Sequence, residues 1–286
     1  MGELLQYLVT GVGLGCGYAL VGSGLVVIHR VTRVVNFAQG AFAVIAALSV
    51  STLLATGLPH GAAEALAVVL AGVAGLLVGA VAIGRSGTSP QSALIVTVGL
   101  GILAYAVEVL IWGDQPRSFA GVPGAVGLAG TRVQAHYLLI IGVTAVVLTG
   151  CALLFARTDV GKALTATAAN RYAARVVGIN VTRMGLVAFA LGGALGGLAG
   201  VLLTPVQQVS FDADVVLVVN GFAAAILGNL VRPGLTLLGG LLLGVVQALV
   251  GGYLSTSYQS EVALVFMLAV LIVRAGRQHA VPEEAQ

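Results

Sequence analysis

Long stretches without charge constrain this chain more than any other feature of its sequence. A helix that crosses a bilayer needs about 17 apolar residues or more, and eight stretches reach that length, with a ninth, shorter one required by the topology. Barrel strands would alternate polar and apolar residues, which these stretches do not do. The sequence therefore predicts an all-α integral membrane protein, a polytopic bundle of about 8–9 transmembrane segments in a single domain over residues 1–286. The stretches are Leu4–Ile28, Phe37–Thr56, Ala62–Ile83, Ser92–Trp112, Tyr137–Ala156, Met184–Val206, Val215–Val231, Gly234–Leu254 and Ser260–Val273.

The composition excludes several classes of protein. Hydrophobic residues make up 59% of the chain and charged residues 8%, against roughly 25% charged residues in soluble domains. The net charge of +3 is small, so we expect no nucleic-acid partner. Cys16 and Cys151 lie in apolar stretches and the histidines have no metal-ligand spacing, which predicts neither a disulfide nor a metal site. No nucleophile is paired with a base, so we expect a non-catalytic chain. The first apolar stretch is not preceded by a cationic segment, so we expect no cleavable signal peptide.

The positive charges give these segments an orientation. Membrane proteins keep Lys and Arg in their cytoplasmic loops. Placing the loop of residues 157–183 inside puts 11 of the 13 cations there and leaves only Arg117 and Arg132 outside. The amino terminus is then outside and the carboxyl terminus inside. The eleven inner cations are Arg30, Arg33, Arg85, Arg157, Lys162, Arg171, Arg175, Arg183, Arg232, Arg274 and Arg277.

The sequence of that loop predicts a short amphipathic helix. Residues Thr165–Val177 hold no proline or glycine and are rich in alanine, with Thr165 as the expected N-cap and Gly178 as a left-handed terminator. Small residues and arginines on its surface would suit docking to another protein, although a solvated loop that fixes the topology would look similar. The residues expected at such a contact are Ala169, Asn170, Arg171, Ala174, Arg175 and Gly178.

Two apolar stretches carry amides that suggest broken or re-entrant helices. Asn36 and Gln39 stand with Gly40 at the start of the second stretch, and Asn220 and Asn229 lie in the seventh. Buried amides in a membrane need partners or a water-filled path, and unwound backbone at such places can line a cavity. We therefore assign Asn36, Gln39, Gly40 and Asn220 to a candidate substrate pathway. The alternative is ordinary helix ends at the membrane interface, which fits Asn229 better because Arg232 follows it.

Glycines spaced by four residues predict close helix packing, because small residues let helix backbones approach in lipid. The glycine-rich start of the chain lacks the spacing and the lysine of a nucleotide loop. The spaced glycines are Gly11/Gly15, Gly13/Gly17, Gly75/Gly79, Gly192/Gly196/Gly200 and Gly240/Gly244.

Glu108 is the only acidic residue well inside a predicted span. It lies one turn from Trp112, which is typical of the membrane interface, so we expect its side chain to extend to the outer surface. A proton-coupled carrier would instead hold such a carboxylate deep in its bundle.

Three regions together resemble the membrane permeases of branched-chain amino-acid ABC importers of the LivH type. Gln39 stands where that family usually has His, and Asn170 where an acidic residue is common. The likeness covers nearly the whole chain. The regions are Tyr18–Leu20 with Val34–Gly40, Thr165–Arg183 with Leu191–Leu202, and Ala223–Gly228 with Gly239–Gly244.

The resemblance implies a subunit of a prokaryotic plasma-membrane importer with several partners. These are a second permease, expected to be a different but related chain, two cytoplasmic ATPases that bind ATP and Mg²⁺, and an extracytoplasmic binding protein. The contact at Ala169–Gly178 would then be a coupling helix seated in an ATPase. This chain has no Walker motif, so ATP hydrolysis would belong to the partners.

A stand-alone secondary transporter or channel is the alternative function. Ion-coupled carriers generally need ionisable residues at mid-membrane, and this chain has almost none there. A membrane enzyme that acts on lipids would need clustered His, Asp or Glu at one interface, which the sequence lacks.

Overall fold

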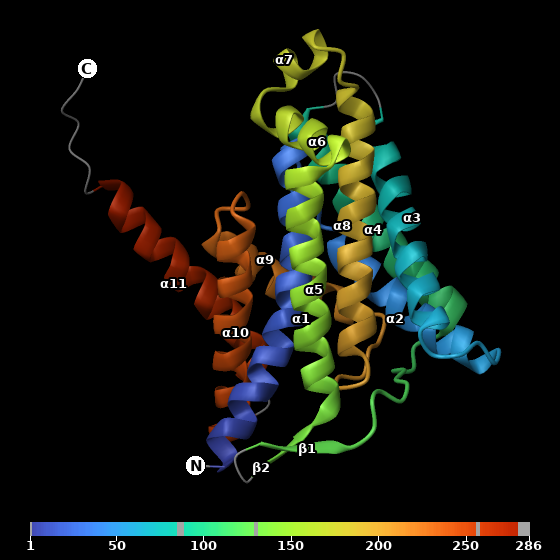
Figure 1. Cartoon of the computed structure of the whole chain (residues 1–286), viewed down its shortest axis with the longest axis vertical. Helices are drawn as coiled ribbons and strands as arrows, with labels where there is room; N and C mark the ends of the chain where they lie inside the picture. Colours follow the sequence, from blue (N-terminus) through green and yellow to red (C-terminus); the bar gives the residue numbers. More distant parts are fainter. Residues whose placement is uncertain (1, 85–88, 129–130, 256–257, 280–286) are drawn as a thin grey trace.

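The chain folds into an elongated bundle of helices (Figure 1). The structure, a computed structural model, describes residues 2–84, 89–128, 131–255 and 258–279, and only the backbone of residues 128, 260 and 274–279. The described residues form 11 helices and one short hairpin, which confirms the predicted all-α class apart from that hairpin.

Six of the helices are long and apolar enough to cross a membrane. Their uninterrupted apolar sequences carry no internal proline, so nothing breaks the backbone hydrogen bonding that a lipid environment demands. They are α1 (Gly2–Thr32), α3 (Ala62–Ile83), α4 (Pro90–Trp112), α5 (Ala135–Arg157), α8 (Val181–Leu203) and α10 (Pro233–Tyr253).

Three further helices have shorter apolar parts. These are α2 (Gln39–Ala55), α9 (Ala213–Leu227) and α11 (Gln259–His279), the last with its apolar part over Glu261–Val273. Each predicted apolar stretch therefore contains one helix, but among the described residues only six helices are both long and apolar enough for a full crossing. α11 leans away from the rest of the bundle (Figure 1).

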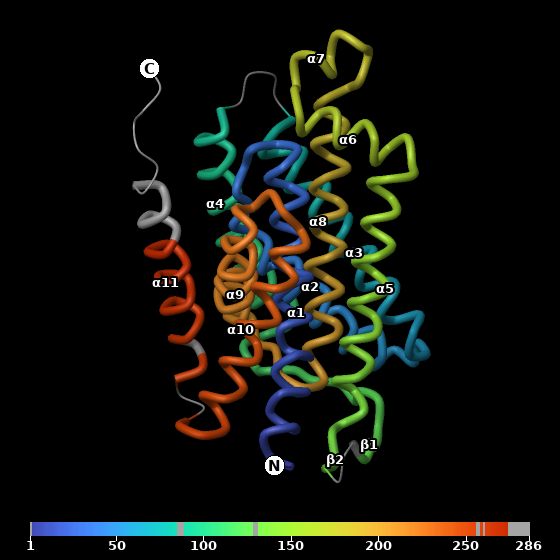
Figure 2. The backbone as a smooth tube through the Cα atoms, turned by 60° about the vertical axis from the view of Figure 1, so that its left-hand side comes forward, coloured from blue at the N-terminus to red at the C-terminus, as the bar shows by residue number. Residues whose placement is uncertain are grey.

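The two ends of the bundle differ in structure. The amino terminus and an antiparallel hairpin of β1 (Ala125–Leu128) and β2 (Thr131–Gln134) lie at one end, which we call the hairpin end. Two short helices, α6 (Asp159–Ala169) and α7 (Arg171–Val176), lie at the other, the α7 end (Figures 1 and 2). The sequence did not predict the hairpin, because its apolar residues are too few to show a period of two.

The described cations also separate between these ends. Arg117 follows α4 and Arg132 lies in β2, both at the hairpin end. Arg30 and Arg33 end α1 at the other, where Arg33 donates a hydrogen bond from Nη2 to the Ala168 carbonyl of α6 at 3.2 Å. Of the remaining predicted inner cations, Arg85 lies outside the described residues, and Arg274 and Arg277 are described by their backbone alone.

The most buried long helix is α1, which packs against α10, α8, α9 and α5. Two of the predicted glycine pairs meet on it. A Cβ on Gly15 of α1 would lie 2.5 Å from the carbonyl oxygen of Gly240 in α10, and one on Gly244 would overlap the carbonyl oxygen of Gly11. This glycine seam brings the two backbones into direct contact, as the spacing predicted.

Gly15→Ala should therefore destabilise the fold by about 1–3 kcal/mol, because the added methyl group forces α1 and α10 apart. Gly142→Ala in α5 is the matched control, since nothing lies within 4 Å of the methyl group that it adds. The control should be neutral or slightly stabilising. Thermal unfolding of the two purified variants in detergent tests this, and equal midpoints would contradict the seam.

Candidate functional site

The loop of residues 157–183 folds as two helices, where the sequence predicted one. The chain breaks at Asn170, whose side-chain oxygen accepts hydrogen bonds from the backbone N–H groups of Tyr172 and Ala173, each at 3.0 Å. Asn170 is thus the N-cap of α7. The cap of the preceding helix is Thr158, so the predicted N-cap at Thr165 was wrong: Thr165 lies inside α6 and its hydroxyl bonds the Gly161 carbonyl.

The predicted terminator is confirmed at Gly178. Its φ is +87°, and the residue ends α7 by bonding its N–H to the Arg175 carbonyl. Asn180 then caps α8 by accepting from the Arg183 N–H at 2.9 Å. This stretch therefore stops one helix and starts the next within three residues, a role for Asn180 that the pattern analysis missed.

The two faces of α7 have different neighbours. Ala174 is 2% exposed and packs against its own chain, whereas Tyr172, Val176 and Val177 are 78%, 71% and 73% exposed. Ala169, Asn170, Arg175 and Gly178 are exposed as well. We call Tyr172, Val176 and Val177 the α7 apolar tip. None of these three was among the predicted contact residues. Of those that were, Ala174 is buried and cannot meet another surface in this conformation.

Arginines tie this region to the end of α1. Nη1 of Arg171 donates to the Thr32 carbonyl at 3.3 Å, opposite the bond from Arg33 to Ala168. Burial lowers the pKa of Arg171, and the positive charges of Arg175 and Arg33 lower it further. The positive potential of this group would favour an acidic partner surface.

Between α1 and α2 the backbone unwinds inside the bundle. It turns at Arg33, which has a φ of +62°, and α2 does not begin until Gln39. The Asn36 side chain takes up the free groups of this segment: its oxygen accepts from the Ala38 N–H at 3.2 Å, and its amide donates to Gln39 Oε1 at 3.4 Å. Gln39 in turn donates from Nε2 to the Gly192 carbonyl of α8 at 2.8 Å.

Asn36 and Gln39 are thus bonded to each other, and both are fully buried. Gln39 fits between α1 and α8 because those helices present glycine: a Cβ on Gly24 would overlap its amide nitrogen, and one on Gly196 would lie 2.8 Å from it. Gly40 contacts the start of α9, where its Cβ would overlap the Asp214 carbonyl oxygen.

Asn220 lies in a second amide pair. It is 2% exposed, and its oxygen accepts from Nε2 of Gln247 in α10 at 2.7 Å. Asn229 instead ends its helix in a left-handed turn with a φ of +55°, which confirms the helix-end interpretation. Gln247 was not among the predicted site residues, because a single amide in a glycine-rich helix gives no pattern of its own.

Glu108 does not reach the surface, so the expectation that it snorkels was wrong. The side chain is 0% exposed. It lies on the face of α4 that also carries the buried Thr97, whose hydroxyl bonds the unwound segment at Val35. Neither carboxylate oxygen of Glu108 has a hydrogen-bond partner.

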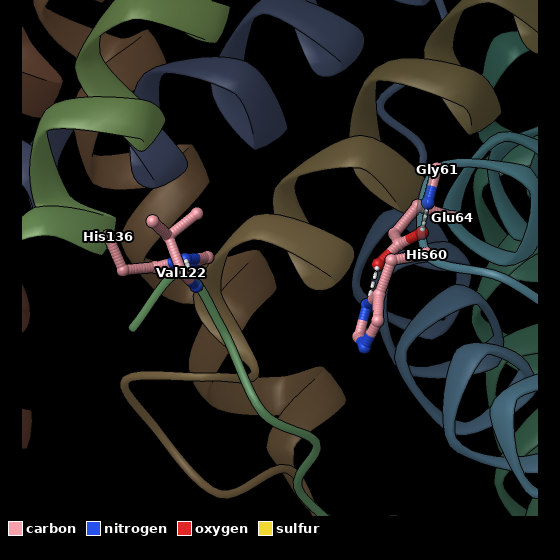
Figure 3. Close-up of polar contacts among 5 residues, drawn as sticks. All are labelled: His60, Gly61, Glu64, Val122 and His136. Carbon is pink, nitrogen blue, oxygen red and sulfur yellow. Dashed lines mark hydrogen bonds and ion pairs between the residues drawn. The ribbon is translucent and has the colours of Figure 1, made fainter. Parts of the chain in front are cut away.

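A cavity of about 700 Å³ opens at the hairpin end among α3, α5 and α8. The polar groups that line it are hydrogen-bonded within the chain, as Figure 3 shows. Nδ1 of His136 accepts from the Val122 N–H at 3.2 Å, which leaves Nε2 to donate to the Leu202 carbonyl at 2.9 Å. Glu64 bonds His60 at 2.9 Å and the Gly61 N–H. These groups hold the fold, and among the described residues no cluster of His, Cys, Asp or Glu could hold a metal ion.

The bundle, its unwound buried segment and its apolar helices define a multi-pass membrane permease. Residues 7–275 match the family described as branched-chain amino acid transport system / permease component, and the chain belongs to that family. It is a non-catalytic membrane subunit of an ABC transport system.

Individual relatives agree with this assignment. The chain is 28% identical to the high-affinity branched-chain amino acid transport system permease protein LivH of Salmonella typhimurium, over 94% of this chain and 93% of that one. It is 28% identical to the BraD permease protein of Pseudomonas aeruginosa, over 94% of each chain. The fold resembles PsaBC of Streptococcus pneumoniae, with a TM-score of 0.52 and 17% identity over 95% of this chain and 91% of that one.

The Asn170 cap can be tested without any partner. Asn170→Ala should weaken the first turn of α7 by about 1 kcal/mol and speed hydrogen exchange of the amides at residues 172–174 about fivefold. Asn170→Asp, which keeps an acceptor, should exchange like the natural protein. Exchange unchanged in the alanine variant would show that α7 does not depend on this cap.

Proposed function

We propose that this chain is a permease subunit of a binding-protein-dependent ABC importer, with α7 as its coupling helix. The observation that carries the proposal is the α7 apolar tip: Tyr172, Val176 and Val177 are exposed on a capped helix at the arginine-rich end of a chain that belongs to a permease family. Exposed apolar side chains rimmed by charge are typical of a protein contact. The fitting occupant is a separate ATPase subunit that binds ATP and Mg²⁺.

The contacts also supply a route for the coupling. α7 is bonded through Arg171 to Thr32 at the end of α1, and α6 is bonded to Arg33. Directly after Arg33 comes the unwound segment that leads to Asn36 and Gln39. A displacement of α7 by the ATPases would therefore be passed to the start of α2 without crossing the whole bundle. Such a packed element with two arrangements is a physical means of transmitting free energy.

The amides are the proposed boundary of the substrate pathway. Asn36, Gln39 and Gly40 lie where α2 begins, and Asn220 lies in the middle of α9, buried in the bundle. In this conformation their polar groups are bonded within the chain. We propose that movement of α2 against α8 and α9 exchanges these bonds for contacts with the solute. The solute class proposed is a branched-chain amino acid or a related small amphipathic molecule, in keeping with the relatives.

The remaining partners follow from the same architecture. We propose that a second permease, a different but related chain, completes the pathway. An extracytoplasmic binding protein would deliver the solute at the hairpin end. We further propose that α2, α9 and α11 are shortened or tilted membrane segments, which makes nine segments in a prokaryotic plasma membrane. The carboxyl terminus is then cytoplasmic, on the same side as α7.

This orientation predicts the outcome of cysteine labelling in intact cells. A cysteine at Asp114, in the exposed turn after α4, should react with a membrane-impermeant maleimide, and a cysteine at Tyr172 should react only after the cells are opened. The expectation follows from the position of the arginines. Labelling of both sites in intact cells would refute the orientation.

The coupling assignment predicts that Val176→Asp weakens binding of the ATPase at least tenfold, because a carboxylate replaces an apolar contact at the centre of the tip. Asp159→Asn, in the neighbouring helix α6 and fully exposed, is the control and should bind normally. Both variants would be reconstituted with the partner subunits, and co-purification of the ATPase and ATP-driven uptake would be measured.

The same reconstitution decides between the two functions. A stand-alone carrier would accumulate solute with no ATPase present, whereas the proposed subunit requires ATP and the complete complex. Normal ATPase binding by Val176→Asp with full ATP-driven uptake would remove α7 from the coupling interface.

A further inference from the structure

Glu108 is a buried acid without a bonding partner in a helix that is otherwise largely exposed. In α4 only Ala93, Thr97 and Glu108 are buried. Both carboxylate oxygens of Glu108 are enclosed and neither receives a hydrogen bond. Buried carboxyl groups are normally hydrogen-bonded or paired because leaving them unpaired costs free energy. Packing in this conformation therefore does not explain why an acid stands at this position, and we look for a functional role.

The surroundings of Glu108 have the chemistry of a site for an amphipathic cation. One turn earlier on α4, the ring of Tyr105 packs edge-on against Phe211, with centroids 5.1 Å apart. Phe37, in the unwound segment before α2, stacks on Phe222 of α9 at 6.4 Å. Aromatic rings thus join α4 to the segment before α9, and the unwound segment to α9. Tyr105 is 40% exposed, which leaves apolar ring surface one turn from the buried acid.

A second acid lies within electrostatic range of Glu108. Asp214, in the first turn of α9, interacts electrostatically with Glu108, and its backbone carbonyl contacts Gly40 at the start of α2. Two acids within range of each other repel when both are ionised, so a cation between them would stabilise both.

The chain supplies no such cation among its described residues. Their ion pairs are His60 with Glu64 and Lys162 with Asp159. The nearest arginine along the chain, Arg117, donates to the Trp112 carbonyl at 3.0 Å instead. Glu108 therefore has acceptors to offer and no internal donor.

We propose that Glu108, supported by Asp214, receives the positively charged nitrogen of the transported solute, while the ring of Tyr105 contacts its apolar part. The inference rests on the proposed transport function and narrows its solute to compounds with a cationic amine. An ammonium group has three donors, which suits two carboxylates better than a neutral solute would. The site opens when α4 and α9 separate, and the binding energy of the cation favours that open arrangement.

The first test is uptake by the reconstituted complex with its binding protein saturated with leucine. Glu108→Gln removes the charge at nearly constant volume and should cut leucine uptake per ATP hydrolysed on the order of tenfold, the effect expected for loss of one charge-assisted hydrogen bond. Glu108→Asp keeps the charge and should recover much of it. Glu3→Gln, an exposed acid at the hairpin end, is the control.

Stability separates this role from a structural one. Glu108→Gln should unfold at the same or a higher temperature, because it removes a buried charge that has no partner. Uptake equal to that of the natural chain in Glu108→Gln would overturn the proposal. So would equal losses in Glu108→Gln and Glu108→Asp accompanied by lower unfolding temperatures, since that result assigns Glu108 to packing.

A second measurement does not depend on transport. A hydrophobic carbodiimide should modify Glu108, and isoamylammonium should protect it while the uncharged 4-methylpentanamide does not. Equal protection by both, or by neither, would overturn the cation site. If the natural complex takes up no amino acid although isoamylammonium protects Glu108, the proposed solute fails and the cation site stands.

Discussion

The structure depends on the satisfaction of backbone polar groups in an environment without water. A helix bonds its own N–H and C=O groups, but wherever it stops inside a membrane the free groups need other partners. The chain stops in this way between α1 and α2, and the side chain of Asn36 stands in for the missing helical bonds while Gln39 anchors the break to Gly192. Glycines at Gly24 and Gly196 leave the room that Gln39 occupies. The unwound segment is therefore a built feature of the bundle.

The break lies next to the region that we propose for coupling. Thr32 and Arg33, at the end of α1, are the residues that α7 and α6 contact, and the unwound segment begins at the same point. The proposal of coupling therefore combines two observations: the family relationship indicates the class of partner, and these contacts connect α7 to the unwound segment.

Sequence reasoning predicted the features that depend on local pattern. The apolar stretches, the left-handed terminator at Gly178 and the contact between the glycine pairs of α1 and α10 all follow from composition and spacing. It failed where a tertiary contact decided the outcome. The partner of Gln39 is 153 residues away, and Glu108 is buried by helices whose arrangement its position near Trp112 does not reveal. The break at Asn170 was missed for a different reason. The alanine-rich sequence on both sides of it has high helix propensity and indicated one continuous helix, although Asn170 is a good capping residue.

The glycine seam has a consequence for how the molecule moves. Helices separated by side chains can slide past each other when those side chains change rotamer. Along the glycine seam, α1 and α10 touch backbone to backbone, and no side chain lies between them to change rotamer. The two helices therefore form one rigid pair. At the end of this pair away from Thr32, the rings of Tyr7 and Tyr253 lie 5.3 Å apart, so a displacement of the end of α1 beside Thr32 also displaces this aromatic pair. Relative motion in the bundle is then left to the helices outside the pair.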